Sequence, residues 1–410
     1  MRIAFIDLMF AWPPQGGAQI DLYHLIKGLQ SQGHEVRLFA AAFDDMWRST
    51  GFVDGDLPFP STLVHFEWAS LSRRNLQRKL WNAVAPWSPE LIFAGFSRYF
   101  KPYIIEALSD YPVISRYYMY EPLCPRDFCL YKDYQRCAND FLRTPNICRK
   151  CTLACRKDHF QATDPKPYAK EIMSAGALTP EYHRLFTKTL AQCRAAIVYN
   201  QLAKDRLEGY CPRIEIIPGG VTVADYPNTP LHTKPKPEVK VILMPGRADD
   251  ELKGLDVLVD AAQGLAQFRD DFQLWVTLDE DPVQQPWFQA LPWRSPKEVV
   301  ALYEQADIVV IPSVWEEPFG LVAVEAMAAG RPVVASRVGG LQHIVREEET
   351  GLLFEAESSA ELAFLLERLL DSAETRCRLG ATGRIIAEEH YDWEHIINTY
   401  YPPLLEWAVS

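Results

Sequence analysis

Two short apolar runs, with one apolar helix between them, constrain the fold of this chain more than any other feature. Residues 308–311 and 333–335 are apolar and mostly β-branched, which predicts strands covered on both faces in a parallel sheet. Residues 321–329 predict a helix, and Gly330 follows it as a terminating glycine. A strand, a helix and a second strand in this order predict an α/β fold.

The loop before this helix carries polar residues that a buried strand and helix do not need. Glu316 and Glu317 come before a Pro-Phe-Gly turn, and Glu317 stands eight residues before Glu325. Two carboxylates beside a helix N-terminus can bind the hydroxyls of a sugar or ribose, while backbone N–H groups face an anion. The alternative is a strand–helix–strand unit of some other α/β protein, in which neither carboxylate has a task.

The string E-P-F-G-L-x-x-x-E, followed by A-M-A-A-G-x-P-V-V-A-S-x-V-G-G, resembles the donor-site signature of family 4 retaining glycosyltransferases. The resemblance implies a GT-B fold, in which two doubly wound, Rossmann-like domains face each other across a cleft. It implies that Glu317 contacts sugar hydroxyls and that Glu325 binds the ribose hydroxyls. The backbone of Phe319, Gly320 and Leu321 is then expected to hold the sugar and the phosphate.

A second group of polar residues follows the strand predicted at 239–245. Arg247 after Gly246, and Lys253 six positions later, resemble the diphosphate-binding pair of the same family. Positioned cations stabilise a departing nucleoside diphosphate, and ligands bind outside the carboxyl ends of strands in open α/β sheets. The alternative is two loop cations that pair with the neighbouring acids. These acids are Asp249, Asp250 and Glu251.

The beginning of the chain repeats the strand–helix–strand pattern over residues 2–8, 18–32 and 36–41. Gly16 and Gly17 lie between the first strand and the helix. They let the backbone approach a ligand closely, although a tight turn explains them equally well. In the resembled family a glycine-rich loop at this place faces the donor diphosphate, so both glycines are candidate donor-binding residues.

Six of the nine cysteines fall within one segment, at about 121–160. Cys148-x-x-Cys151 has metal-knuckle spacing, and two more cysteines can complete a tetrahedral site. The alternatives are an iron–sulfur cluster, disulfides or unliganded thiols. The candidate ligands are Cys124, Cys137, Cys148 and Cys151, and Cys129 and Cys155 are alternative ligands. A subset of the resembled family carries L-C-P-R and then a C-x-x-C pair, which implies an insert held by a structural zinc. That subset usually has a histidine before L-C-P-R, where Tyr118 stands here.

Length and composition predict the domain organisation. A chain of 410 residues implies two or three domains. Prolines and polar residues at 226–238 predict a linker between an acceptor-binding domain, 1–225, and a nucleotide-sugar-binding domain, 239–393. In GT-B enzymes the last helix crosses back, so residues 394–410 are expected to pack on the N-terminal domain.

Charge and hydropathy limit the partners and the compartment. A net charge of −12 argues against nucleic-acid binding. No apolar run reaches the roughly 18–20 residues that span a bilayer, and the first residues predict a strand rather than a signal peptide. The chain is therefore expected in the cytoplasm. A basic amphipathic helix at 70–85 is either a peripheral membrane contact or a solvated surface helix.

The resemblance implies retaining transfer of a hexosyl-type sugar from a UDP- or GDP-sugar to an acceptor hydroxyl on a glycan, a lipid or a small molecule. Arg247, Lys253 and Glu317 are the expected catalytic residues, in a front-face mechanism that needs no cofactor. One alternative is a GT-B sugar-phosphate synthase or phosphorylase. Another is a non-catalytic assembly protein that binds a nucleotide sugar. The sequence identifies neither the donor nor the acceptor.

Overall fold

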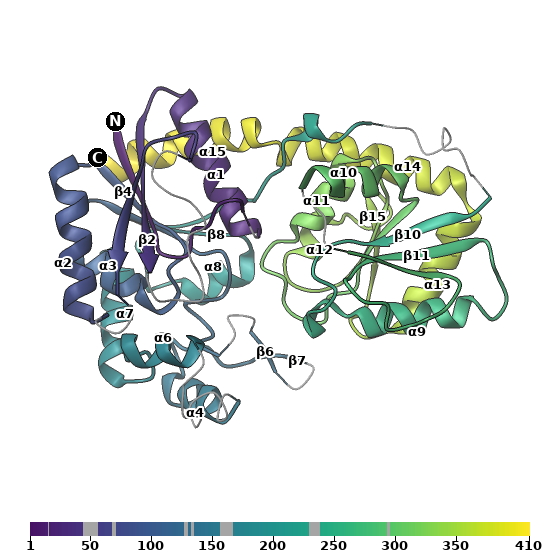
Figure 1. The fold of residues 1–410 in the computed structure, drawn as a ribbon, viewed down its shortest axis with the longest axis horizontal. Coiled ribbons are helices and arrows are strands. Elements are labelled where there is room, and N and C mark those ends of the chain that lie inside the picture. Colours follow the sequence, from purple (N-terminus) through teal and green to yellow (C-terminus); the bar gives the residue numbers. More distant parts are fainter. Residues whose placement is uncertain are drawn as a thin grey trace. The chain divides into compact units, whose positions relative to one another are not determined.

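The computed structural model describes residues 1–14, 16–43, 56–67, 71–126, 130–132, 135–155, 167–228, 238–292 and 296–410. The chain divides into two compact units (Figure 1). The first comprises Met1–Leu130, Cys137–Pro218 and Ile397–Ser410, and the second comprises Tyr131–Arg136 and Gly219–Ile396. Most of the expected linker, residues 229–237, lies outside the described residues, as does Cys129.

The first unit is built on a parallel sheet with the strand order β3-β2-β1-β4-β5-β8-β9. The strands are β1 (Arg2–Asp7), β2 (Glu35–Phe43), β3 (Ser61–Phe66), β4 (Leu91–Ala94), β5 (Val113–Arg116), β8 (Ala195–Val198) and β9 (Ile214–Ile216). Strand order reverses between β1 and β4, and this reversal is where open α/β sheets bind ligands.

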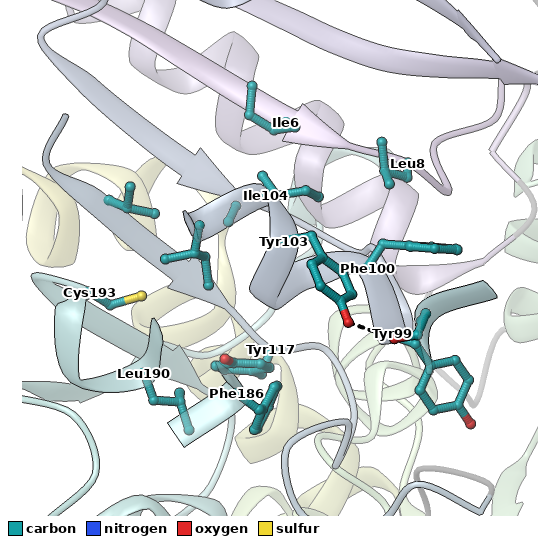
Figure 2. Packing of buried hydrophobic residues seen from close by; sticks show 14 of the residues in the cluster. Ile6, Leu8, Tyr99, Phe100, Tyr103, Ile104, Tyr117, Phe186, Leu190 and Cys193 are labelled. Atoms are coloured by element: carbon teal, nitrogen blue, oxygen red, sulfur yellow. Dashed lines mark hydrogen bonds between the residues drawn. The ribbon is translucent and has the colours of Figure 1, made fainter. Parts of the chain in front are cut away.

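Up to Pro218, the first unit contains seven α-helices and two 3-10 turns among the described residues. They are α1 (Gly17–Ser31), α2 (Arg73–Val84), α3 (Lys101–Ala107), α4 (Pro145–Cys155), α6 (Pro167–Ala175), α7 (Pro180–Gln192) and α8 (Gln201–Leu207), with the 3-10 turns η2 (Ala85–Trp87) and η3 (Arg98–Phe100). Figure 2 shows Ile6 and Leu8, around the end of β1, near Ile104 of α3 and Phe100 of η3. These side chains belong to one buried cluster, so the sheet and helices share a core.

The end of the chain completes the first unit. From Ile397 on, α15 (Trp393–Val409) belongs to this unit. A Cβ atom at Gly28 of α1 would lie 2.6 Å from the Ile397 side chain, so the glycine makes room for the isoleucine. The guanidinium groups of Arg194 and Arg213 lie 5.3 and 4.6 Å from the Trp407 ring. Aliphatic packing and cation–π contacts therefore hold this helix in place.

The second unit has its own parallel sheet, in the order β12-β11-β10-β13-β14-β15. Its strands are β10 (Lys240–Met244), β11 (Phe272–Thr277), β12 (Phe288–Leu291), β13 (Ile308–Ile311), β14 (Val333–Ser336) and β15 (Gly351–Phe354). Its helices are η4 (Val223–Asp225), η6 (Glu251–Lys253), α9 (Leu255–Leu265), α10 (Pro296–Gln305), α11 (Leu321–Ala328), α12 (Leu341–Ile344), α13 (Ser359–Asp371), α14 (Ala373–Ile386) and the π-helical η7 (Ala387–Tyr391). Strand order reverses between β10 and β13.

The predicted α/β class with two doubly wound sheets is confirmed. The strand predicted at 308–311 is β13, and the helix predicted at 321–329 is α11. Among the described residues, no helix combines the length and the apolar character that crossing a bilayer requires.

Candidate functional site

Two loops lie against each other at the point where strand order reverses in the second sheet. One follows β10 and the other follows β13. The N–H of Val314 donates to the carbonyl of Leu252 at 3.0 Å. Gly254 has a φ of +74°, and a Cβ atom there would collide with the carbonyl oxygen of Pro312. Only glycine combines this backbone conformation with such a close approach, so Gly254 fixes how the loops meet.

The centre of the candidate site is the Glu317 carboxylate. Its Oε1 accepts from Lys253 Nζ at 2.5 Å, from Ser313 Oγ at 2.8 Å and from Trp315 Nε1 at 3.0 Å. The ammonium of Lys253 also lies 5.4 Å from the Trp315 ring centroid. The structure thus brings together two predicted catalytic residues, Lys253 and Glu317. Three donors on one oxygen hold this buried carboxylate in a single orientation.

Arg247 reaches into solvent beside this centre. Its side chain is 64% exposed, and its guanidinium lies 3.5 Å from the carboxylate of Asp250. Arg247 therefore pairs with an acid of its own loop, as the alternative interpretation expects. Lys253 does not, because its partner is Glu317 of the other loop. An exposed pair of this kind contributes at most about 1 kcal/mol, so a bound anion could compete for Arg247.

A glycine turn before α12 fixes the backbone of the donor loop, residues 312–320. The N–H of Gly340 donates to the carbonyl of Glu317 at 2.6 Å. A Cβ atom at Gly339 would collide with the Glu317 backbone, and one at Gly340 with the Phe319 carbonyl. Gly320 is the N-cap residue of α11 and has a φ of +119°. The predicted donor-binding backbone therefore lies at the N-terminus of α11, under close steric control.

Glu325, the predicted ribose ligand, lies on α11, which begins at Leu321. Its Oε2 accepts from the Tyr303 hydroxyl at 2.6 Å, and the Tyr226 hydroxyl also hydrogen-bonds this carboxylate. Burial raises the pKa of Glu325 to about 7, against the opposite effect of the two tyrosines. The two tyrosine partners were not predicted from the sequence, because both come from other segments of the second unit.

The predicted glycines of the first unit lie where α1 begins. Gly17 is the first residue of α1, and the carbonyl of Gly16 accepts the N–H of Gln19 at 3.1 Å. The backbone at Gly16 is extended, with a φ of −175°, which any residue adopts. Backbone conformation therefore does not explain the glycine at position 16.

The reversal point of the first sheet holds a buried carboxylate that the sequence analysis did not single out. Asp7, at the end of β1, accepts the N–H of Met9 at 2.9 Å and the N–H of Phe96 at 2.8 Å. Burial raises the pKa of Asp7 to about 7, while these backbone bonds and Lys101 lower it. Asp7 ties the loop after β1 to the loop after β4.

A second buried polar group surrounds Tyr118, the residue that the sequence analysis placed nearest to the family's histidine. The Arg116 guanidinium lies 2.5 Å from the Asp21 carboxylate and donates to the Tyr401 hydroxyl at 3.2 Å. The Tyr199 hydroxyl donates to Asp21 at 3.1 Å. The Tyr118 ring lies 5.4 Å from this guanidinium, so the tyrosine packs on an ion pair.

The structure does not support the predicted zinc site. Across the described residues, no three His, Cys, Asp or Glu side chains gather closely enough to hold a metal ion. Cys148 is buried, whereas Cys155 is exposed. Burial raises the pKa of the Cys148 thiol to about 12, to which nearby Cys124 and Cys137 add.

Solved structures with the same architecture are GT-B glycosyltransferases. Sucrose-phosphate synthase from Thermosynechococcus elongatus matches with a TM-score of 0.67 at 21% identity, covering 99% of both chains. The Anabaena protein Alr3699/HepE, solved in complex with UDP, matches with a TM-score of 0.67 at 17% identity, covering 99% of this chain and 100% of that one. This protein therefore has the GT-B class of fold.

Sequence comparison identifies a family for part of the chain. Residues 239–372 carry the sequence of the glycosyl transferases group 1 family. D-inositol 3-phosphate glycosyltransferase from Corynebacterium glutamicum is 40% identical over an alignment of 267 residues, and the match covers 59% of this chain and 62% of that protein. Phosphatidyl-myo-inositol mannosyltransferase from Mycobacterium leprae is 35% identical over 185 residues, 43% of this chain and 49% of that protein. The matches thus span less than two thirds of either relative.

Proposed function

We propose that this chain is a retaining glycosyltransferase of family 4, which moves a hexosyl-type sugar from a nucleoside diphosphate to an acceptor hydroxyl. The observation that carries the proposal is the contact between Lys253 and Glu317 at the reversal point of the second sheet. The family match over residues 239–372 supports it, because it covers both residues. A purely structural sheet needs no lysine and carboxylate at this place.

Lys253 and Arg247 have the chemistry to stabilise the leaving group. An ammonium has three N–H donors, and Glu317 uses one of those on Lys253, which leaves two for phosphate oxygens. Arg247 offers an exposed planar fork. When the bond between the anomeric carbon and the diphosphate breaks, negative charge grows on the phosphate oxygens. Cations already in place lower the free energy of that transition state.

Glu317 has two tasks in this proposal. It holds Lys253 and orients toward the sugar hydroxyls, while the backbone at the N-terminus of α11 receives the phosphate. Glu325 receives the ribose hydroxyls. In front-face transfer, the leaving phosphate takes the proton from the acceptor hydroxyl as the new glycosidic bond forms. The step needs no metal and no cofactor, because the protons move between substrate groups.

The acceptor and the donor are proposed by class. Two relatives are named for inositol-containing acceptors, so D-inositol 3-phosphate is the first acceptor to test, before lipid-linked and glycan acceptors. A UDP- or GDP-sugar is the proposed donor, and UDP-glucose is a suitable first probe, since a related fold was solved with it. The acceptor domain at 1–225, the donor role of Gly16 and Gly17, cytoplasmic location and peripheral membrane contact remain proposals of the same kind.

A structural zinc on the cysteine segment also stays a proposal. It is supported only by the spacing of Cys148 and Cys151 and by the nearness of Cys124 and Cys137 to Cys148. Metal analysis of the purified protein tests it directly. About one zinc per chain, lost in a C148S/C151S variant, would support the site; a metal-free and fully stable protein would remove it.

The function is tested by thermal shift with UDP-, GDP-, ADP- and dTDP-sugars, followed by product analysis with the donor that binds. Transfer to a hydroxyl with retained anomeric configuration supports the proposal. A product formed only from a free sugar phosphate acceptor would instead favour a synthase or phosphorylase. Tight donor binding without transfer or donor hydrolysis would favour a non-catalytic binding protein.

A further inference from the structure

A small hairpin far away in the sequence contributes to the donor loop. Strands β6 (Tyr131–Lys132) and β7 (Gln135–Arg136) pair antiparallel, and this segment belongs to the second unit. Arg136 Nε donates to Glu316 Oε1 at 2.5 Å, and its Nη2 donates to Glu316 Oε2 at 3.1 Å. Two parallel N–H bonds to one carboxylate are the strongest geometry that an arginine offers.

Glu316 joins three segments of the second unit at one carboxylate. It is only 5% exposed, and its Oε2 also accepts the N–H of Gly339 at 2.9 Å. The next residue, Glu317, has its carbonyl bound by Gly340 and its carboxylate bound by Lys253. Arg136 of the hairpin and Gly339 of the glycine turn thus both bind Glu316. The candidate catalytic residue, Glu317, is the next residue in the chain.

The burial of Glu316 makes this arginine more than a surface contact. A carboxylate removed from water needs opposite charge or several donors, or its burial becomes unfavourable. Without Arg136, the Glu316 carboxylate keeps only the neutral N–H of Gly339 as a donor among the described residues. The Glu316 side chain would then turn toward water and carry the backbone with it. Glu317 is one peptide unit away, so its contact with Lys253 would loosen.

We propose that Arg136 is a positioning residue of the donor loop. Through Glu316 it holds residues 312–320 in the conformation that places Glu317 on Lys253. The effect of Arg136 on enzyme kinetics rests on the proposed glycosyltransferase function. Its effect on the conformation of the donor loop does not. A segment within the cysteine-containing stretch of the chain thereby becomes part of the donor-binding architecture.

Hydrogen exchange of the full-length protein tests the loop directly. In R136A we expect the amides of residues 312–320 to exchange about tenfold faster than in the wild type, as expected when a charge-assisted hydrogen bond is lost. R136K, which keeps the charge but not the fork, is expected to fall between them. Equal exchange of this peptide in R136A and wild type would overturn the proposal.

The matched control is R368A. Arg368 of α13 also makes two hydrogen bonds to one carboxylate, from Nη1 and Nη2 to Glu348 at 2.6 and 2.8 Å, in the same unit. We expect R368A to leave the exchange of residues 312–320 unchanged. If R368A accelerates that peptide as much as R136A does, the effect is a general loosening of the unit and the proposal fails. If R136A does not fold, the exchange of residues 312–320 is compared between wild type, R136K, E316Q and the R368A control instead.

Kinetics and nucleotide binding give the second measurement. R136A is expected to raise the donor KM and the nucleotide Kd about tenfold while changing kcat less, because it disturbs the loop that receives the donor. The E316Q variant should have a similar effect, and R136A/E316Q should add little to either single change. Additive effects would overturn the proposed path through Glu316. If the wild type shows no transfer, the proposed function fails, but the exchange experiment still decides the role of Arg136.

Discussion

The ammonium of Lys253 lies 2.5 Å from Glu317 Oε1, although 64 positions separate the two residues in the chain. The contact joins the loop after β10 to the loop after β13, on the two sides of the point where strand order reverses. Parallel sheets bring the carboxyl ends of such strands to one edge. The fold therefore assembles the pair, and the pair in turn fixes both loops.

Replacing Lys253 by alanine is expected to reduce kcat/KM for transfer by at least about 100-fold, because a preorganised cation is lost from the leaving phosphate. The melting temperature should fall modestly while the fold stays intact, because the buried Glu317 loses its cation but keeps Ser313 and Trp315 as donors. Steady-state kinetics and thermal melting measure the two effects. K188A is the control, because Lys188 is exposed in the first unit and pairs with surface Glu106 at 3.3 Å. Full activity of K253A would contradict the site assignment.

Glu317→Ala and Glu317→Gln separate the charge of this carboxylate from its shape. Both changes are expected to abolish most transfer, since both leave Lys253 without its ionic partner. Glutamine still accepts from Ser313 and Trp315, so E317Q should melt closer to wild type than E317A does. Transfer assays and calorimetry check this order. A fully active E317Q would show that the negative charge is not used.

Gly254 is expected to tolerate no side chain. The G254A variant places a Cβ against the Pro312 carbonyl at a positive φ, which we expect to destabilise the protein by about 1–3 kcal/mol and to separate the two loops. The comparison is G264A in α9, where nothing lies within 4 Å of the added Cβ. That change should be neutral or stabilising by up to about 1 kcal/mol. Denaturant titration measures both, and equal stabilities would refute the steric argument.

Glu325 is expected to make stability depend on pH. Its folded-state pKa is about 7, above the ordinary value of 4.5, so the folded protein holds a proton that the unfolded chain releases. This contribution is present below pH 4.5 and is lost as the pH rises through about 7. Asp7 contributes in the same direction. The drop in Tm between pH 5 and pH 8 should therefore be smaller in E325Q than in wild type, and an unchanged drop would contradict the raised pKa.

Tyr303 is expected to tune nucleotide binding through Glu325. Its hydroxyl bond lowers the pKa of Glu325, so Y303F should raise that pKa further. If the ionised carboxylate binds the ribose, nucleotide affinity falls as the pH falls through about 7, and Y303F moves this midpoint upward. Calorimetry with UDP or GDP from pH 5.5 to pH 8.5 measures the shift. Y400F, on α15, serves as the control and should keep the wild-type midpoint.

The sequence predicted the architecture of the second sheet because buried parallel strands need continuous apolar runs. β13 and β14 have such runs, and α11 between them is apolar on nearly every side. β12 and β15 were missed. The first mixes Phe288 and Leu291 with a glutamine, and the second begins with Gly351, so neither has a distinctive pattern.

The candidate site was predicted only as far as its motifs extend. Lys253 and Glu317 stand in recognisable strings, whereas Trp315 and Ser313 are ordinary loop residues whose role appears only when they point at one oxygen. Arg136 could not be found from the sequence, because its partner is 180 positions away. Such contacts depend on distances in the folded chain, and no local spacing encodes them.

The docking of Ile397 against Gly28 and of Tyr401 against Arg116 has a consequence for the order of synthesis. A ribosome delivers residues 1–218 long before residues 397–410. Until then, the nascent first unit lacks the side chain that fills the space over Gly28 and the hydroxyl that Arg116 bonds. The first half of the chain is thus synthesised first, but its unit can complete its folding only after the entire second unit has left the ribosome.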